Sequence, residues 1–325
     1  MPTRKLSMAV AGVALLSLGA SACGGLSTKP SSGSGPCQGV TAGSVDSSAL
    51  KGVTVKVGSK EFDEQLVLGQ LTLKMMCAAG AKAVDETNTK GTTQTRAKLL
   101  RGDSDVYWGY TGTAWIDFLK HDKPIHDSQK QYEAVKKEDL VKNNVVWGPK
   151  APFNNTYAFA VTDEFAKKNS LKTDSDMAKY INQNPKSKVC LESEYANRPD
   201  GYPGFKKTYG IKGGQQKVLG IGVVYTQTDK GNCDFGEVFT TDGRIKALGL
   251  TVLDDDKTYH PLYNGVPVVL KKTNDAHPQI LEVLRPLAAA LTTDAVAQLN
   301  TLVSAKGENP SKVAEDFLKQ KGFLK

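Results

Sequence analysis

The chain has 325 residues, of which 23% are charged, and its formal net charge is +8. The charges are interspersed and no basic block carries interleaved aromatic residues, so a nucleic-acid-binding surface is not expected. The four histidines show no HExxH spacing and the five cysteines no C-x-x-C spacing, so no metal site is expected either.

The amino terminus has the composition of an export signal. Arg4 and Lys5 precede an apolar run over residues 6–19, and the small residues "ASA" follow it. The run is too short for a permanent membrane span, which takes about 20 apolar residues. We therefore expect a signal peptide over residues 1–22 and an exported protein.

Cys23 follows this signal directly, and "ASAC" resembles a lipobox, although Ala20 stands where that motif prefers Leu. Acylation of Cys23 would anchor the protein to the outer face of the cytoplasmic membrane; the alternative is ordinary cleavage that leaves a free Cys23. The next stretch, "GGLSTKPSSGSGP", has too few apolar side chains to pack. Residues 23–51 are therefore expected to form a lipid-anchored flexible tether.

The chain after the tether begins with alternating strand and helix patterns. Strands are expected at "VTVKVGS", "AKAVDET" and "SDVYWGYTG", and helices at "FDEQLVLGQLTLKMMCAA" and "TTQTRAKLLRG", which Gly102 would stop. This βαβαβ order predicts parallel strands joined by helical crossovers.

A second α/β unit is expected from about Val145. Its strand candidates are "VVWGPK", "TYAFAVT", "SKVCLES" and "CDFGEVF", separated by helical stretches and by the Gly-rich segment "YGIKGGQQKVLGIGVV". A further strand is expected at "GVPVVLKK", and from His277 the pattern is helical with amphipathic faces.

Without Cys23 the chain has four cysteines, and an even number in an exported protein suggests two disulfides. Cys190 and Cys233 lie in strand candidates that could be neighbours, and Cys37 would then pair with Cys77. Connectivity cannot be read from sequence alone, so this pairing is a hypothesis.

Three segments, two from the first unit and one from the second, are expected to meet at a ligand site, because ligands of open α/β sheets lie beyond the carboxyl ends of the strands. "GSKEF" follows the first expected strand and "YTGTAW" the third, which brings a positive charge on Lys60 near Tyr110 and the hydroxyl of Thr113. Taken alone, a lysine is more often at the surface, and Trp108 and Trp115 are more often core residues.

Five motifs in order change this interpretation: "VKVGSKEFDEQLVLGQ", "DVYWGYTGTAW", "FNNTYAFAV", "SEYANRPDGYPG" and "VFTTDGRI". From about Val53 to the end, the chain resembles the substrate-binding proteins for quaternary-ammonium osmoprotectants, the glycine betaine, choline and carnitine receptors of ABC importers. The resemblance implies an α/β fold of the type II periplasmic binding proteins, with two lobes, a two-stranded hinge and the ligand in the cleft between the lobes. Residues 52–155 and 260–325 would form lobe I, and residues 156–259 lobe II.

That family surrounds a trimethylammonium group with aromatic rings and pairs the ligand's carboxylate with basic side chains. By motif position, the rings would be Tyr110, Tyr157, Phe239 and Tyr263. The carboxylate would meet Lys60 and Arg198 with Thr113 beside them, and Glu194 would either orient Arg198 or be solvated. Phe239 stands where relatives often carry Tyr, and Asn155 where some carry Asp, so no anion is evident beside the cation.

The resemblance implies a binding protein without catalysis or cofactor. It would capture a small quaternary-ammonium solute outside the membrane as a monomer and deliver it to a permease with a cytoplasmic ATPase. One alternative is a receptor of the same fold for an aromatic or polyphenolic compound. Another is an exported enzyme, although no G-x-S-x-G motif is present.

Overall fold

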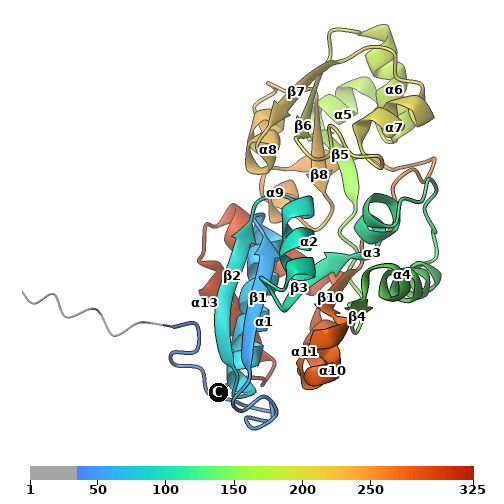
Figure 1. The fold of residues 1–325 in the computed structure, drawn as a ribbon. Helices are drawn as coiled ribbons and strands as arrows, with labels where there is room; N and C mark the ends of the chain where they lie inside the picture. The colour runs from blue at the N-terminus through green and yellow to red at the C-terminus, as the bar shows by residue number, and fades with distance from the viewer. Residues whose placement is uncertain (1–34) are drawn as a thin grey trace, which may run out of the picture. The chain divides into compact units, whose positions relative to one another are not determined.

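The computed structural model describes residues 35–325, which form two five-stranded mixed sheets with helices packed around them (Figure 1). The expected signal peptide, Cys23 and the first part of the expected tether lie outside the described residues. We call the first sheet and its helices lobe I, and the second sheet and its helices lobe II. Lobe I contains β1 Thr54–Lys60, α1 Asp63–Ala78, β2 Lys82–Thr89, α2 Thr92–Arg101, β3 Val106–Tyr110, α3 Thr111–Thr113, the π-helical turn η1 Ala114–Phe118, α4 Ser128–Asn143, β4 Val145–Trp147, β10 Gly265–Leu270, α10 Lys271–Ala276, α11 Gln279–Ala290, α12 Thr293–Asn300, the π-helical turn η2 Thr301–Ala305 and α13 Pro310–Gln320. Lobe II contains β5 Tyr157–Thr162, α5 Asp163–Asn169, α6 Asp174–Gln183, β6 Lys188–Glu192, α7 Tyr202–Tyr209, β7 Gln215–Leu219, α8 Ile221–Asp229, β8 Phe235–Phe239, α9 Gly243–Ala247 and β9 Leu250–Val252.

The sheet of lobe I has the strand order β2-β1-β3-β10-β4. β1 runs parallel to β2 and β3, as the βαβαβ pattern predicted, and β10 is antiparallel to both β3 and β4. The helix between β2 and β3 ends as expected at Gly102, whose φ of 81° is in the left-handed region that glycine adopts readily. The carboxyl ends of β1 and β3 therefore lie side by side, which places Lys60 and Tyr110 on one edge of the sheet.

The sheet of lobe II has the order β7-β6-β8-β5-β9. β6 is parallel to β7 and β8, whereas β5 is antiparallel to β8 and β9. Tyr157 at the start of β5 pairs directly with Phe239 at the end of β8. This register brings two of the expected ring positions together.

Two segments connect the lobes, residues 148–156 and residues 253–264. They run side by side: Asn154 and Asn264 form an antiparallel bridge, and the Asn155 amide donates to the Tyr263 carbonyl over 3.1 Å. The sequence prediction of a two-stranded connection is confirmed.

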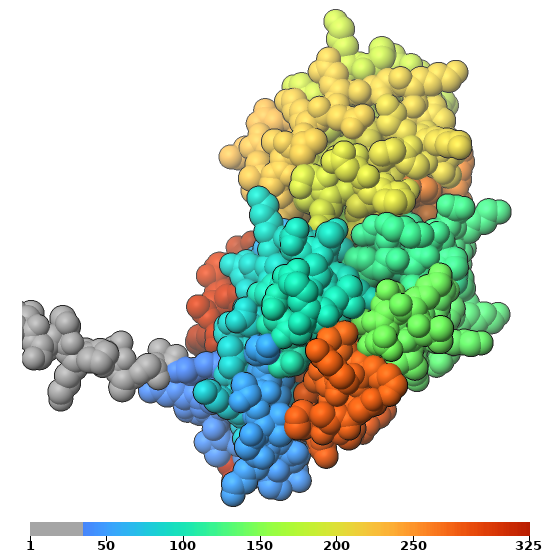
Figure 2. Space-filling view, viewed as in Figure 1, coloured from blue at the N-terminus to red at the C-terminus, as the bar shows by residue number. Residues whose placement is uncertain are grey.

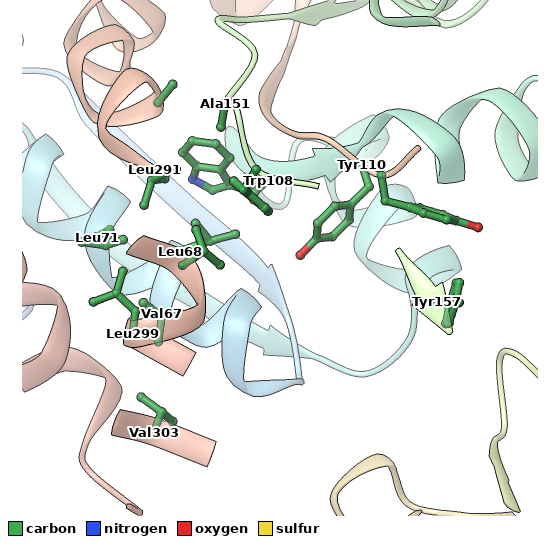
Figure 3. Packing of buried hydrophobic residues seen from close by; sticks show 14 of the residues in the cluster. Val67, Leu68, Leu71, Trp108, Tyr110, Ala151, Tyr157, Leu291, Leu299 and Val303 are labelled. Carbon is green, nitrogen blue, oxygen red and sulfur yellow. The ribbon is translucent and has the colours of Figure 1, made fainter. Parts of the chain in front are cut away.

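The core of lobe I contains α1 and the C-terminal helices, although they lie far apart in the sequence. Figure 3 shows Leu68 and Leu71 of α1 close to Leu299 of α12 and to Trp108 of β3. The Trp108 indole donates to the Thr72 hydroxyl over 2.9 Å, which satisfies its buried N–H group. Trp108 is thus a core residue.

The expected tether is too long. Residues 37–51 pack on lobe I: Leu50 is buried, its amide donates to the Ala79 carbonyl, and Ala42 forms a bridge with Leu324. The spacing of apolar residues here is too irregular to predict a helix or strand, but enough of them are present to cover the end of α1.

Both expected disulfides are present. Cys37–Cys77 ties the segment before β1 to α1, and Cys190–Cys233 ties β6 to the turn before β8. The helix α8, the strand β7 and the short strand β9 were not predicted. β4 belongs to lobe I, in agreement with the bounds 52–155 and not with a second unit that begins at Val145. Within residues 35–325, no helix is both long and apolar enough to cross a membrane.

Candidate ligand-binding site

A cavity of about 430 Å³ lies between the two lobes. This volume is within the range of about 300–1,000 Å³ that is usual for small-molecule sites. Eight of the nine expected binding residues line it: Lys60, Tyr110, Thr113, Asn155, Tyr157, Glu194, Phe239 and Tyr263. Arg198 is the exception.

Five aromatic side chains form what we call the aromatic box: Phe62, Tyr110, Tyr157, Phe239 and Tyr263. The Tyr157 ring centroid lies 5.1 Å from Phe239 and 5.3 Å from Tyr263, which it meets at 89°. The Phe62 ring lies 5.3 Å from Phe239 and 6.4 Å from Tyr110. The faces of such rings are negative and attract cations.

Phe62 was not predicted. It follows Lys60 by two residues and stands directly before α1, so its backbone is held by the helix start. The motif "GSKEF" contains Phe62 close to Lys60, and this proximity in the sequence to an expected site residue could have identified Phe62 as a further site residue. Phe62 adds a second ring from lobe I, next to Tyr110, to the two rings from lobe II.

Burial raises the pKa of the Tyr110, Tyr157 and Tyr263 phenols well above their ordinary value. They therefore remain neutral at physiological pH. The Tyr110 hydroxyl donates to Glu64 over 2.7 Å, and the Tyr263 hydroxyl donates to Asp200 over 2.5 Å. These bonds fix the orientation of both rings.

Lys60, the last residue of β1, is buried among the rings. Its Nζ lies 5.2 Å from the Tyr110 centroid and 5.9 Å from the Phe62 centroid. Burial lowers the pKa of Lys60 to about 8, although the Glu194 carboxylate opposes this effect. At neutral pH the side chain is still mostly charged, and it places a positive charge on one wall of the cavity.

Arg198 lies behind the cavity wall rather than in it. Its Nε and one terminal nitrogen donate to the two oxygens of Asp200 over 2.7 and 2.9 Å. Its guanidinium carbon is 5.5 Å from the Tyr157 centroid. The planar fork expected to hold a ligand carboxylate is thus occupied by a carboxylate two residues away.

Glu194 joins the lobes. It belongs to lobe II, yet its carboxylate accepts hydrogen bonds from the amide (2.5 Å) and the hydroxyl (2.8 Å) of Thr92, the first residue of α2 in lobe I. Burial alone would raise the pKa of Glu194, but Lys60, the two Thr92 donors and Arg198 together lower it. Glu194 is therefore bonded to Thr92 rather than merely solvated, and its distance of 3.8 Å from Arg198 makes orientation of that residue a minor role.

A buried carboxylate lies directly behind the box, contrary to the expectation that no anion is near. Glu64 in the first turn of α1 accepts four hydrogen bonds. The donors, at 2.5–2.9 Å, are Tyr110, Asn155, Thr241 and Asn300. The Asn155 amide is thereby matched to Glu64, whereas an Asp at this position would set two carboxylates against each other.

Further contacts join residues of lobe I to residues of lobe II. Arg244 at the start of α9 lies 3.3 Å from Asp63 of α1 and is held by Asp242. Figure 2 shows atoms of lobe II directly against atoms of lobe I on the face in view. With Glu194–Thr92 and Glu64–Thr241, these contacts hold a closed arrangement around the cavity.

Two further aromatic residues, Tyr195 and Trp115, differ in their relation to the aromatic box. Tyr195 packs on Tyr157 with the ring centroids 4.7 Å apart, and so supports the box from behind. Trp115, for which the sequence favoured a core position, is only half-buried: it stacks on His121 and its indole donates to the Lys123 carbonyl. Trp115 lies in the π-helical turn η1 and does not line the cavity.

Comparisons with known proteins agree with this geometry. Residues 53–320 match the family described as the substrate binding domain of ABC-type glycine betaine transport system. The chain is 33% identical over 279 residues to the glycine betaine-binding protein YehZ of Escherichia coli (strain K12), which covers 83% of this chain and 92% of that protein. It is 31% identical over 278 residues to the ergothioneine transport permease/ergothioneine binding protein EgtU of Helicobacter pylori (strain G27), covering 85% of this chain and 49% of that protein.

A solved structure described as a glycine betaine/carnitine/choline ABC transporter superposes with a TM-score of 0.69 at 32% identity, over 83% of this chain and 99% of that chain. The predicted fold of two α/β lobes around a cleft, typical of periplasmic binding proteins, is confirmed. The chain belongs to the family of substrate-binding domains of ABC-type glycine betaine transport systems.

Proposed function

We propose that the protein captures a small zwitterion with a quaternary ammonium group at one end and a carboxylate at the other, of which glycine betaine is the simplest. The ammonium group would lie in the aromatic box. Desolvated rings contribute roughly 2 kcal/mol each, so four or more would give a binding free energy near 8 kcal/mol, which corresponds to micromolar affinity.

The observation that carries this proposal is the position of Lys60. Its ammonium group lies 5.2 Å from the ring centroid of Tyr110, a member of the box, and it is 6% exposed. A ligand with a positive charge alone would be repelled by Lys60, whereas a zwitterion can set its carboxylate against Lys60 and its cation against the rings. Lys60 is therefore the proposed carboxylate partner, with Thr113 beside it.

The roles of the other expected residues follow from their contacts. Arg198 would act through Asp200 and Tyr263, because its fork is already bonded. Asn155 would hold Glu64 in place behind the rings. Glu194 would fasten the lobes over the ligand through Thr92.

We further propose that the protein works outside the cytoplasmic membrane as a monomer, delivers its ligand to a permease with a cytoplasmic ATPase, and carries out no catalysis. The sequence at residues 4–23 supports acylation of Cys23 after cleavage. Two acyl chains on one cysteine suffice for stable anchoring. A Cys23→Ala form that still partitions with membranes in a lipid-labelling assay would contradict the anchor.

A larger betaine with an aromatic ring is the second candidate. The cavity extends to Val218, Leu219 and Ile221 of lobe II, which offer an apolar wall beyond the box. The relative named for ergothioneine supports this candidate. Glycine betaine alone would leave this wall without contact.

Calorimetric titration of the purified protein tests both candidates. The panel is glycine betaine, proline betaine, carnitine, choline, ergothioneine and a neutral polyphenol, with solute concentrations followed afterwards to detect turnover. We expect the zwitterions to bind at least tenfold more tightly than choline. If the polyphenol bound most tightly, the receptor for aromatic compounds would replace this proposal, and turnover of any solute would favour an enzyme.

A further inference from the structure

Three side chains that could bind a metal ion meet in lobe II. Asp174 is the first residue of α6, and Asp255 and His260 belong to the segment that leads back to lobe I. One carboxylate oxygen from each Asp and a ring nitrogen of His260 all lie within 4.8 Å of one another. Ligand atoms of one tetrahedral ion, bound at about 2.0–2.2 Å, stand about 3.3–3.6 Å apart, so the three groups would have to approach one another by up to about 1 Å for coordination.

Asp174 points to a missing partner. It is completely buried, and neither of its side-chain oxygens has a hydrogen-bond partner. A proton would remove the charge but would leave the oxygens without partners, which is costly in a buried site. A bound cation would satisfy both the charge and the oxygens.

The other two side chains are held in place by their neighbours. Asp255 accepts hydrogen bonds from the amides of Tyr259 and His260 and from the Tyr209 hydroxyl. The His260 Nδ1 lies 3.1 Å from Asp255, and its Nε2 lies 2.7 Å from the Tyr195 hydroxyl. A metal-bound histidine commonly donates its other ring N–H to such a group, which fixes the ring.

We propose that Asp174, Asp255 and His260 bind one divalent first-row metal ion, Zn²⁺ or Mn²⁺. Both oxygens of Asp174 are free to bind, which makes four donor atoms with one oxygen of Asp255 and Nδ1 of His260. Two carboxylates balance the charge of a divalent ion, and the imidazole favours a first-row metal over Ca²⁺, which takes oxygen ligands. Asp255 retains 21% exposure of its side chain and offers the way in.

The site would be structural. It joins α6 to the connecting segment, and through Tyr195 it supports Tyr157 of the aromatic box. No sequence motif indicates the site, because Asp255 stands 81 positions after Asp174 and no short motif contains all three ligands. The inference does not depend on which solute the cavity binds.

Metal binding to the chelator-treated protein tests the proposal, with Zn²⁺, Mn²⁺ and Ca²⁺ added separately. We expect one Zn²⁺ or Mn²⁺ per chain and a rise in the unfolding temperature of roughly 5 °C at 100-fold excess over the dissociation constant. Asp174→Asn should lose at least tenfold in affinity and most of the temperature shift. The matched control is His121→Ala, which removes a histidine that contacts Glu138 over 2.8 Å and should change nothing.

A measurement on the unaltered protein makes the test independent of the folding of the variant. Bound Mn²⁺ should broaden the NMR signals of the His260 ring while those of His121 stay sharp. The proposal is overturned if none of the metals shifts the unfolding temperature, if Asp174→Asn binds as tightly as the parent, or if His121 is broadened instead. The Asp174 carboxyl would then be a neutral buried acid.

Discussion

Glu64 of lobe I and Thr241 of lobe II are joined by a hydrogen bond of 2.5 Å between Oε2 and the Thr241 hydroxyl. The other oxygen of the same carboxylate accepts from the Tyr110 hydroxyl, so one buried anion both orients a ring of the box and connects the lobes. Burial raises the pKa of Glu64, whereas its four hydrogen-bond donors favour the ionised form, and in that form it adds to the negative potential that the rings present to a cation. A quaternary ammonium ligand and lobe closure are thus favoured by the same group.

Glu64→Gln should weaken binding of glycine betaine by about tenfold or more and lower the free energy of unfolding by about 2 kcal/mol. The amide can accept at one oxygen only, so donors that faced the carboxylate lose their partner, and hydrogen bonds to charged groups are worth about 1.5–3 kcal/mol. Calorimetry and urea unfolding measure the two effects. Glu61→Gln is the control, since Glu61 also lines the cavity but its hydrogen bonds among the described residues come from the Gly91 amide alone. An equal loss of affinity and stability in that variant would contradict the special role of Glu64.

The two tyrosines of the box should differ in their response to loss of the hydroxyl. Replacing either Tyr110 or Tyr157 by Ala removes a ring worth about 2 kcal/mol and should weaken a quaternary-ammonium ligand by roughly 30-fold. Tyr157→Phe keeps the ring and should cost little. Tyr110→Phe should cost clearly more, because it removes the donor to Glu64.

Titration of each variant with glycine betaine and with a neutral tert-butyl analogue of the same shape checks this. The neutral analogue should bind the parent protein poorly and respond less to the substitutions. Equal affinity for both ligands would mean that the box is only a hydrophobic pocket.

The sequence was informative where a motif lies at the end of a strand. Lys60 and Tyr110 end β1 and β3, and parallel neighbours bring such ends together, so their meeting follows from local patterns. The fold could also be predicted from local patterns, because alternating strands and helices imply parallel strands. β7 and α8 were missed because a Gly-rich segment has no clear apolar period.

Contacts between groups that lie far apart in the chain could not be predicted from the sequence. Glu64 lies 236 residues from Asn300, and nothing in either local pattern links them. Arg198 shows a different limit: its partner Asp200 is only two residues away, but the family position suggested a ligand carboxylate instead. The sequence shows that Arg198 and Asp200 are close along the chain, but it does not show whether they bond to each other or whether Arg198 is available to a ligand.

Binding of a zwitterion should weaken as the pH rises through about 8. Burial lowers the pKa of Lys60 to about 8, so its ammonium is present below this pH and is lost above it. A bound carboxylate favours the charged form, so affinity should fall by up to tenfold per pH unit until the pKa of the complex is reached. Calorimetry from pH 6 to pH 10 with glycine betaine measures this slope.

Choline, which has no carboxylate, provides the comparison. Its affinity should rise over the same pH range, since loss of the Lys60 charge removes a repulsion. Lys60→Met should flatten both profiles. A profile for glycine betaine that is flat in the parent protein would show that another group binds the carboxylate.

We expect the hydrogen bonds between Glu194 and Thr92 to stabilise the closed form. Thr92→Val removes the hydroxyl donor but keeps the shape and the amide, so one of the two bonds to the carboxylate remains. A bond to a charged group is worth about 1.5–3 kcal/mol, and because Glu194 is partly exposed we expect the lower end, a roughly tenfold loss of affinity. The loss should appear in the dissociation rate, because the contact forms only when the lobes meet.

The control is Thr92→Ser, which keeps the hydroxyl and should restore parent behaviour. Stopped-flow fluorescence gives the rates, and small-angle scattering at saturating ligand gives the compaction; unchanged dissociation in Thr92→Val, or no compaction of the parent on binding, would contradict closure through this contact.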